Sequence, residues 1–300
     1  MKKLLFIISS KAGKTEFDIK KEDLIALTNK APSDIDIEIV ETRYKGHIKD
    51  AIDSFAKDKL SDKYAIVCGG DGSLNELVNA GYGKDIALGL IPMGTGNDFA
   101  KNFDYKNFSL EKALSFRTRP IDLIAINDKL CINVTSLGFD TQVLEEAYRF
   151  LHKKPSIGKK AYIYAVISSL RNIQYEKLDI TMTMDDGSRK NISGDFLISA
   201  LCNGGFYGSG FNPAPKAVID DGIINLVCAD KIPFYKLPLL ILKYKKGRHG
   251  TSPHLNEYKI KSGKISSSKA FLGNIDGEIF TAKEIDFKIL PSAIRWIYFE

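Results

Sequence analysis

The spacing of apolar positions changes character part of the way along the chain. Up to about Pro120, apolar runs typical of buried strands alternate with segments in which apolar residues recur at helical spacing. The strand-like segments are 3–9, 34–42, 63–70 and 86–94, and the helix-like segments are 16–31, 47–60, 73–83 and 95–103. This alternation predicts an α/β domain in which helices cover a parallel sheet.

After Pro120 the chain consists mostly of short segments rich in β-branched residues and separated by turns. Such segments are 121–128, 129–139, 178–187, 195–204, 222–230, 257–268, 270–278 and 285–299, and an Asp-Gly pair within 184–188 is typical of a hairpin turn. Two stretches with helical spacing, 141–150 and 159–172, interrupt them. We therefore predict a second domain, an antiparallel β-sandwich or barrel-like fold, without a flexible linker before it.

Composition adds little to this prediction of the fold, but it argues against a secreted, membrane-spanning or disulfide-stabilised protein. With 44% apolar and 27% charged residues and a net charge of +6, the chain has the composition of a mildly basic globular protein. The N-terminal run 4–8 is too short for a signal peptide, and the apolar stretch 232–244 is interrupted by Pro and Lys. The four cysteines lie far apart, which favours buried free thiols in the reducing cytoplasm over a metal site or disulfides.

Two glycine-rich stretches carry the candidate chemistry. "VCGGDGSLNEL" (67–77) and "LGLIPMGTGNDFAKNF" (88–103) each place glycines between a predicted strand and a predicted helix. A helix N-terminus with glycine before it attracts phosphate, and neighbouring strands of a parallel sheet would bring both turns to one edge. The simpler interpretation is a tight turn before a helix that starts near Ser73, capped by Ser73 or Asp71 with Glu76 completing a capping box. Neither stretch matches the standard P-loop or dinucleotide motif.

The motifs resemble the diacylglycerol kinase catalytic-domain family of lipid kinases. "GGDGSLNE", "PMGTGNDFA", "IDDG" and "NIDGE" match its hallmarks in order, whereas the first loop, "SSKAG", lacks the usual Asn-Pro. The resemblance covers essentially the whole chain. It implies an N-terminal α/β domain (1–120) of the NAD kinase and phosphofructokinase type, to which 288–300 return, a β-sandwich lipid-substrate domain (121–287), and an active site in the cleft between them.

The resemblance also implies site residues, of which most would bind ATP. Asn97 and Asp98 would order the second turn. The expected nucleotide-binding residues are Ser10, Lys11, Thr42, Gly69, Gly70, Asp71, Gly72, Ser73, Asn75 and Thr95.

The remaining implied residues are acids. Asp71 would also bind Mg²⁺, directly or through water, and Glu278, ahead of Asp276, would be the base that activates the lipid hydroxyl. Asp221, with the backbone carbonyls of Val218 and Ile223, would hold a structural Mg²⁺. For Asp71, Asp221 and the "NIDGE" acids, an ordinary turn is the competing interpretation.

The function that follows is an ATP- and Mg²⁺-dependent kinase that phosphorylates a hydroxyl of diacylglycerol or a related lipid. The alternatives are a kinase of the NAD kinase type with a soluble substrate, and a silent nucleotide-binding regulator. Two basic stretches with apolar residues, 149–172 and 234–250, are compatible with peripheral contact to an anionic membrane by a cytoplasmic protein, although a solvated helix face is the commoner meaning. No nucleic-acid-binding motif accompanies the charge, and edge strands of the second domain could pair two chains into a homodimer.

Overall fold

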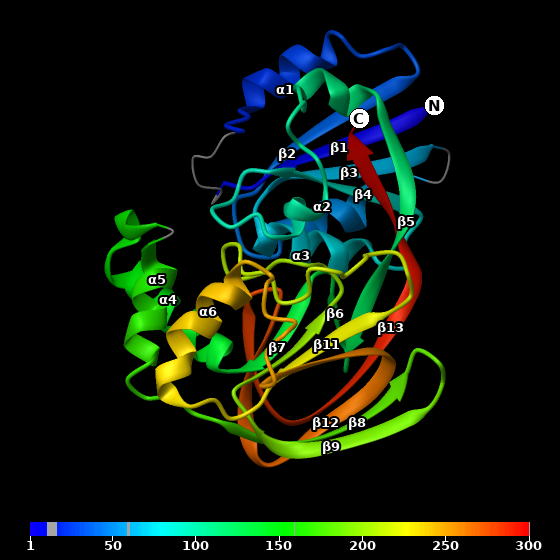
Figure 1. Cartoon of the computed structure of the whole chain (residues 1–300). Helices are drawn as coiled ribbons and strands as arrows, with labels where there is room; N and C mark the ends of the chain where they lie inside the picture. Colours follow the sequence, from blue (N-terminus) through cyan, green and yellow to red (C-terminus); the bar gives the residue numbers. More distant parts are fainter. Residues whose placement is uncertain (11–16, 59–60, 159, 300) are drawn as a thin grey trace. The chain divides into compact units, whose positions relative to one another are not determined.

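The chain forms two compact units. The computed structural model describes residues 1–10, 17–58, 61–158 and 160–299 (Figure 1). Unit 1 runs from Met1 to Ile121 and takes in the C-terminal segment from Ser292, while unit 2 is Asp122–Pro291. From the sequence we expected the boundaries between the two domains after residues 120 and 287. The boundaries between the two units in the structure lie after residues 121 and 291.

Unit 1 is built on a parallel sheet with the strand order β4-β3-β1-β2. The strands are β1 (Lys2–Ile8), β2 (Ile35–Glu41), β3 (Asp62–Gly69) and β4 (Ile86–Pro92). The helical elements are α1 (Lys21–Thr28), α2 (His47–Phe55), α3 (Asp71–Gly81) and the 3₁₀ turns η1 (Phe99–Asn102) and η2 (Leu110–Leu114). The predicted parallel α/β arrangement is confirmed, but the helix predicted over 95–103 is only the short turn η1.

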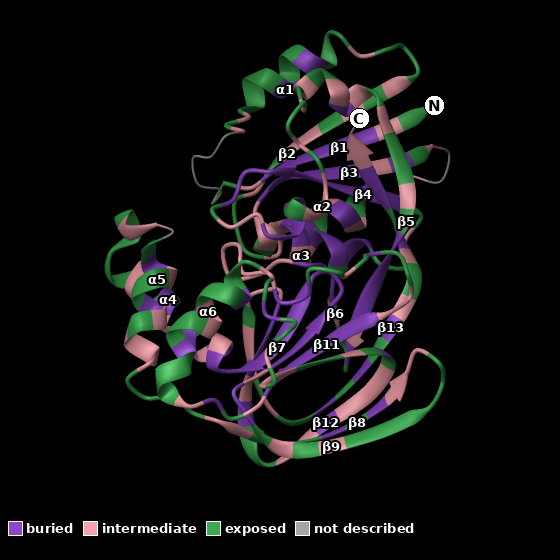
Figure 2. Ribbon diagram, viewed as in Figure 1, coloured by how far each residue is buried: buried purple, intermediate pink, exposed green. Residues whose placement is uncertain are grey.

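Burial explains why these strands have these sequences. All seven residues of β4 are buried, as a strand covered on both faces requires, whereas β2 alternates between half-buried and exposed positions at the sheet edge (Figure 2). The last part of β13 (Glu278–Phe299) joins this unit, where Trp296 pairs in parallel with Leu88. The Trp296 ring is fully buried and packs edge-on against Phe99, with ring centroids 5.2 Å apart. The C-terminal strand is therefore part of the core of unit 1.

Unit 2 is an antiparallel β-sandwich, as predicted. Its strands follow the order β11-β10-β7-β12-β13. In addition, β8 pairs with β12 and with β9, whereas β5 pairs with β13 and with β6. They are β5 (Phe116–Ile126), β6 (Lys129–Cys131), β7 (Val134–Gly138), β8 (Glu176–Met184), β9 (Arg189–Phe196), β10 (Ile198–Cys202), β11 (Ile224–Ala229), β12 (Leu255–Ile275) and β13. The strands predicted at 257–268 and 270–278 are one strand, β12, with an irregularity in its pairing between Ser266 and Phe271. The predicted Asp-Gly hairpin joins β8 to β9.

Helices cover one side of this unit (Figure 1). They are α4 (Phe139–Lys153), η3 (Pro155–Ile157), α5 (Lys160–Ser169), η4 (Phe234–Lys236) and α6 (Leu237–Lys245). Buried residues of α4, α5 and α6, including Phe139, Ala165 and Leu237, form one apolar cluster. Beneath α6 lies a small open hollow with room for about 30 Å³, and the wall surface that it exposes is apolar. Within the described residues, none of the helices combines the length and hydrophobicity needed to cross a membrane.

Candidate active site

The two glycine turns of unit 1 lie directly against each other. A Cβ atom added at Gly94 would lie 2.3 Å from the Cα of Gly70, so the two backbones approach more closely than any side chain permits. The Met93 N–H also donates to the Gly69 carbonyl (2.8 Å). The expected convergence of both turns at the carboxyl edge of β3 and β4 is therefore confirmed.

The first turn opens a helix whose cap has no side chain. Helix α3 begins at Asp71 with Gly70 as its N-cap, so the predicted cap by Ser73 or Asp71, with its capping box, is wrong. The sequence favoured Ser73 because serine is a good cap, but the close contact with Gly94 makes Gly70 the last extended residue. Because Gly70 has no side chain, the N–H groups of the first turn are left to other acceptors. Among the described residues, no atom outside the local helix backbone lies within 4 Å of the place that a Cβ of Gly72 would take. This is a suitable cradle for phosphate oxygens.

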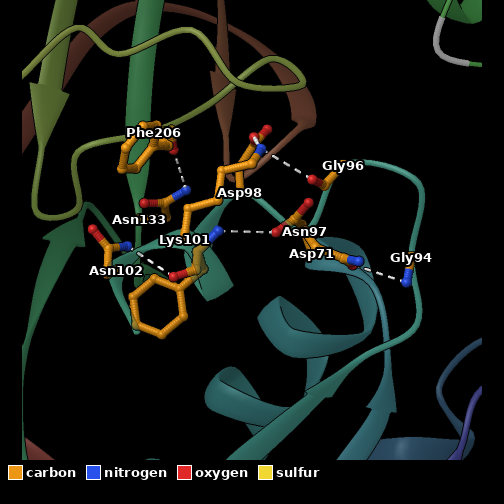
Figure 3. Close-up of polar contacts among 10 residues, drawn as sticks. Asp71, Gly94, Gly96, Asn97, Asp98, Lys101, Asn102, Asn133 and Phe206 are labelled. Atoms are coloured by element: carbon orange, nitrogen blue, oxygen red, sulfur yellow. Dashed lines mark hydrogen bonds and ion pairs between the residues drawn. The ribbon is translucent and has the colours of Figure 1, made fainter. Parts of the chain in front are cut away.

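Asp71 faces the second turn. Its Oδ1 accepts the Phe99 N–H (3.2 Å), and burial together with the nearby Asp98 carboxylate raises the Asp71 pKa to about 6. Lys101 pairs with Asp98 and also donates to the Gly96 carbonyl (3.1 Å; Figure 3). The charge of Asp98 thus acts on Asp71, and carboxylate oxygens of this kind are ligands that Mg²⁺ prefers.

Asn97 closes the second turn, as expected. It adopts a left-handed backbone (φ 49°) and accepts the Gly94 N–H on its Oδ1 at 2.8 Å (Figure 3). Asp98 is buried, whereas Thr95 is exposed on the loop. The hydroxyl of Thr95 is therefore open to a ligand.

The ends of β1 and β2 lie beside the first glycine turn. The Ser9 N–H donates to the Cys68 carbonyl (2.9 Å), and the Ser10 N–H donates to Thr42 Oγ1 (3.0 Å). A Cβ at Gly69 would lie 3.2 Å from that of Ser9. These contacts bring Ser10 and Thr42 to the carboxyl edge of the sheet, and Lys11 lies outside the described residues.

Two other residues of the first motif occupy α3 itself. Asn75 is joined to Asn79, whose Nδ2 donates to the Asn75 carbonyl (2.9 Å). Glu76 Oε1 is buried without a hydrogen-bond partner among the described residues. Both side chains belong to the helix behind the turn, consistent with the supporting role that the resemblance implies.

In unit 2, the "NIDGE" motif is the tip of a hairpin. Asp276 and Gly277 both have positive φ (47° and 91°) between paired Ile275 and Glu278, the geometry of a two-residue type I′ turn. The Tyr148 hydroxyl of α4 donates to the Gly277 carbonyl (2.8 Å). Glu278 is exposed at the first position of β13.

The two acids of this motif differ in environment. The Asp276 carboxylate accepts three backbone N–H groups, from Ile132 (2.9 Å), Asn133 (3.0 Å) and Val134 (3.0 Å). These bonds hold the 131–134 segment onto the hairpin. Of the two acids, Glu278 is thus the one whose exposure suits proton transfer.

The "IDDG" turn (219–222) contains Asp221, which the sequence identified, and also binds Asp122 from another part of unit 2, which the sequence did not identify. Asp221 Oδ1 accepts the Ile223 N–H (3.0 Å), while burial, with a contribution from the charge of Asp122, raises the pKa of Asp221. Asp122 is itself buried and accepts the Gly222 N–H on Oδ2 (2.7 Å). Sequence reasoning missed Asp122, although an acid inside the apolar run "IDLIAI" was a signal that it has a specific partner.

These groups fit the predicted metal site by their chemistry. Carboxylate oxygens of Asp221 and backbone carbonyls of Val218 and Ile223 are the hard donors that Mg²⁺ prefers. Among the described residues, no cluster of three or more His, Cys, Asp or Glu side chains could hold a metal ion. A cation at the "IDDG" turn would therefore need backbone ligands in addition to Asp221, as the prediction assumes.

Comparisons with known proteins account for both units. A family model described as "Diacylglycerol kinase catalytic domain" matches residues 3–126, and one described as "YegS C-terminal NAD kinase beta sandwich-like domain" matches 133–298. A probable lipid kinase YegS-like protein of Shewanella frigidimarina is 27% identical, covering 91% of this chain and 92% of the relative. The probable lipid kinase YegS of Escherichia coli is 31% identical, covering 79% of this chain and 78% of the relative.

Solved structures agree on the fold. A putative diacylglycerol kinase from Bacillus anthracis superposes with a TM-score of 0.72 at 20% identity, covering 99% of this chain and 97% of that one. The resemblance recognised in the motifs is confirmed. The chain is a kinase, and it belongs to the YegS-like family that combines a diacylglycerol kinase catalytic domain with an NAD kinase-like β-sandwich.

Proposed function

We propose that this kinase transfers the γ-phosphoryl group of ATP to a hydroxyl of diacylglycerol or a related lipid, giving phosphatidic acid or its analogue. The observation that carries the proposal is the backbone contact of Gly70 with Gly94 at the N-terminus of α3, beside a space at Gly72 that no other described residue fills. Phosphoryl transfer depends mainly on positioning and charge neutralisation, and this edge of unit 1 supplies both.

The nucleotide is assigned to the carboxyl edge of unit 1. N–H groups of the first turn of α3 would bind phosphate oxygens, and hydroxyl groups of Ser73 and Thr95 would add further donors. Ser10 and Thr42, joined by a hydrogen bond at the adjoining strand ends, are assigned to the same nucleotide.

We assign to Mg²⁺ the neutralisation of the negative charge on the phosphate oxygens of the transferred group. Asp71 would hold that ion directly or through water, and Asp221 would hold a second, structural ion within unit 2. Asp98 and its partner Lys101 keep Asp71 in place by fixing the second turn.

Proton transfer is assigned to Glu278. Its exposed carboxylate would accept the proton of the lipid hydroxyl as the oxygen attacks phosphorus. Asp276 would position Glu278, because its three backbone hydrogen bonds fix the hairpin. The reaction requires the phosphate held by unit 1 to meet the acid held by unit 2, and the cleft expected from the resemblance stays a prediction.

The decisive experiment follows label from γ-labelled ATP into a panel of lipids dispersed in mixed micelles, with mass detection of the product. We expect phosphorylated diacylglycerol or a close analogue, and loss of product in Asp71→Ala. Transfer to NAD instead would establish the soluble-substrate alternative. ATP binding without transfer to any lipid would favour the silent regulator.

A further inference from the structure

Helix α6 is apolar on both of its faces. Leu237, Leu240 and Tyr244 face inward, where they line the apolar hollow. On the opposite side Leu239 and Leu242, three positions apart, are 61% and 58% exposed. A surface helix normally turns polar residues outward, so an outer apolar stripe indicates contact with a nonaqueous partner.

The turn that leads into α6 extends this stripe. Phe234 and Tyr235 of η4 are 66% and 78% exposed, and Tyr235 lies four positions before Leu239, on the same helical face. Aromatic rings of this kind prefer the boundary between water and lipid headgroups.

Helix α5 repeats the pattern. Ala161 and Ala165 are buried, whereas Ile163, Tyr164 and Ile167 follow helical spacing on the outer face and are about half exposed. Both helices pack on the same buried cluster, and both outer faces are largely exposed (Figure 2). Two helices that pack on the same buried cluster thus present large apolar side chains to solvent.

The charge around these side chains has one sign. The segment 231–248 contains six Lys or Arg residues and no Asp or Glu. Its exposed cations are Lys231, Lys236, Lys243, Lys245, Lys246 and Arg248. Exposed Lys153, Lys154, Lys160 and Arg171 flank α5, again without an acid between 152 and 171. Basic residues beside an apolar stripe complement anionic headgroups, because the charges bind phosphate while the apolar tips leave water.

We propose that the outer faces of η4–α6 and α5 form a docking face that inserts into the surface of an anionic bilayer. The docking face consists of Ile163, Tyr164, Ile167, Phe234, Tyr235, Leu239 and Leu242. The inference deepens the proposed function, since it names the surface by which the kinase reaches a lipid acceptor. A bilayer fits better than a protein partner, because flexible lysines and scattered apolar tips need no shaped complement in fluid lipid.

The test is vesicle binding without ATP, which keeps it independent of catalysis. Wild type is floated with vesicles of phosphatidylcholine containing phosphatidylglycerol and with phosphatidylcholine alone, and we expect strong preference for the anionic vesicles. Leu239→Glu with Leu242→Glu should weaken binding at least about tenfold, since two apolar side chains no longer leave water. The matched control is Ile25→Glu, at a similarly exposed position in α1 of unit 1. Thermal unfolding verifies that each variant is folded.

Charge is tested separately. Lys243→Gln and Lys246→Gln should each weaken anionic binding about fivefold, as expected for a lysine near such a surface. Lys269→Gln and Lys283→Gln, exposed on β12 and β13, serve as controls. Leu239→Trp adds a direct probe, because the single native tryptophan, Trp296, is buried. Its emission should shift to the blue on vesicles and be quenched by brominated lipid.

Each outcome is decisive. Unchanged binding in the double glutamate variant, equal binding to both vesicle types, or an unquenched probe would overturn the docking face. Loss of vesicle binding in a variant that still phosphorylates a dispersed short-chain lipid would support both proposals. Intact vesicle binding in a protein that phosphorylates no lipid would overturn the proposed function alone.

Discussion

Replacement of Gly94 by alanine tests whether the contact between the two glycine turns is essential. The new Cβ would lie 2.3 Å from Gly70 Cα and 2.8 Å from Asn97 Oδ1. Carbon atoms in contact are normally separated by about 3.5–4.0 Å, so the two turns would have to move apart by roughly 1 Å or more. Neither obstacle is the free end of a flexible side chain, since one is backbone and the other is held by the Gly94 N–H.

The substitution should lower both the stability of the protein and the rate of catalysis. Overpacking of this kind typically destabilises a protein by about 1–3 kcal/mol, which corresponds to a decrease in Tm of roughly 2–12 °C for a protein of this size. Separation of the turns would also displace the N–H groups that we propose bind phosphate, and a shift of about 1 Å in a positioning group costs on the order of 100-fold in rate. We therefore expect Gly94→Ala to lower both Tm and kcat/KM, and Gly70→Ala to do the same.

Gly72→Ala is the matched control within the same motif. Its Cβ would meet no atom of the described residues within 4 Å beyond the local helix backbone, and alanine stabilises a helix relative to glycine by about 0.5–1 kcal/mol. The Tm should stay equal or rise, whereas ADP affinity measured by calorimetry should fall, because the methyl group occupies the proposed phosphate position. A Gly94→Ala variant with wild-type Tm and kcat/KM would refute the steric argument, and unchanged ADP affinity in Gly72→Ala would refute the phosphate position.

Four further variants separate structural from chemical roles. Glu278→Gln should leave Tm unchanged and lower kcat by a factor of about 10²–10⁴, as expected for loss of a general base. Asp276→Asn should lower the free energy of unfolding by about 1–3 kcal/mol, because it weakens hydrogen bonds to buried backbone. If melting and turnover assays gave the opposite pattern, Asp276 would be the base and Glu278 the structural residue. Asp140 lies in the first turn of α4, where burial raises the pKa of its carboxyl to about 6. Because the folded state favours the protonated carboxyl, Asp140 stabilises the fold at acid pH, and this stabilisation is lost as pH rises through about 6. Relative to Asp140→Asn, wild type should lose about 2–3 kcal/mol between pH 4 and pH 7 in urea titrations, and parallel pH profiles would contradict this. Mg²⁺ should raise the Tm of wild type more than that of Asp221→Asn, because only the site in unit 2 is lost, and an equal rise in both would remove Asp221 from the metal site.

The sequence predicted those structural features that depend on residues close together in the chain. Apolar runs and turn residues were sufficient for the strands of both units, and the glycine turns followed from their place between strand and helix. The position of the α3 cap was not local, because Gly70 is fixed by Gly94, a residue on another strand end.

The acids show the same limit more strongly. Asp276 looked like a solvated turn residue, yet it binds the backbone at 132–134, more than 140 positions earlier in the chain. Asp122 has no motif at all, and its partner Gly222 is separated from it by 100 residues. Such pairings depend on how strands are ordered in the sandwich, which alternation of apolar residues does not encode. Recognition of the family identified the motifs, but only the structure distinguished a tethered acid from an exposed one.

The place of Trp296 makes the first glycine turn dependent on a distant part of the chain. The Trp296 ring packs on Phe99, and the Phe99 backbone N–H donates to Asp71, so strand β13 supports the turn from which α3 begins. Unit 1 combines Met1–Ile121 with the segment from Ser292, and Asp122–Pro291, which lies between them in the chain, is unit 2. Removal of the segment from Ser292 would therefore take a packing partner from Phe99 and loosen the proposed phosphate site, although both glycine motifs would remain in the chain.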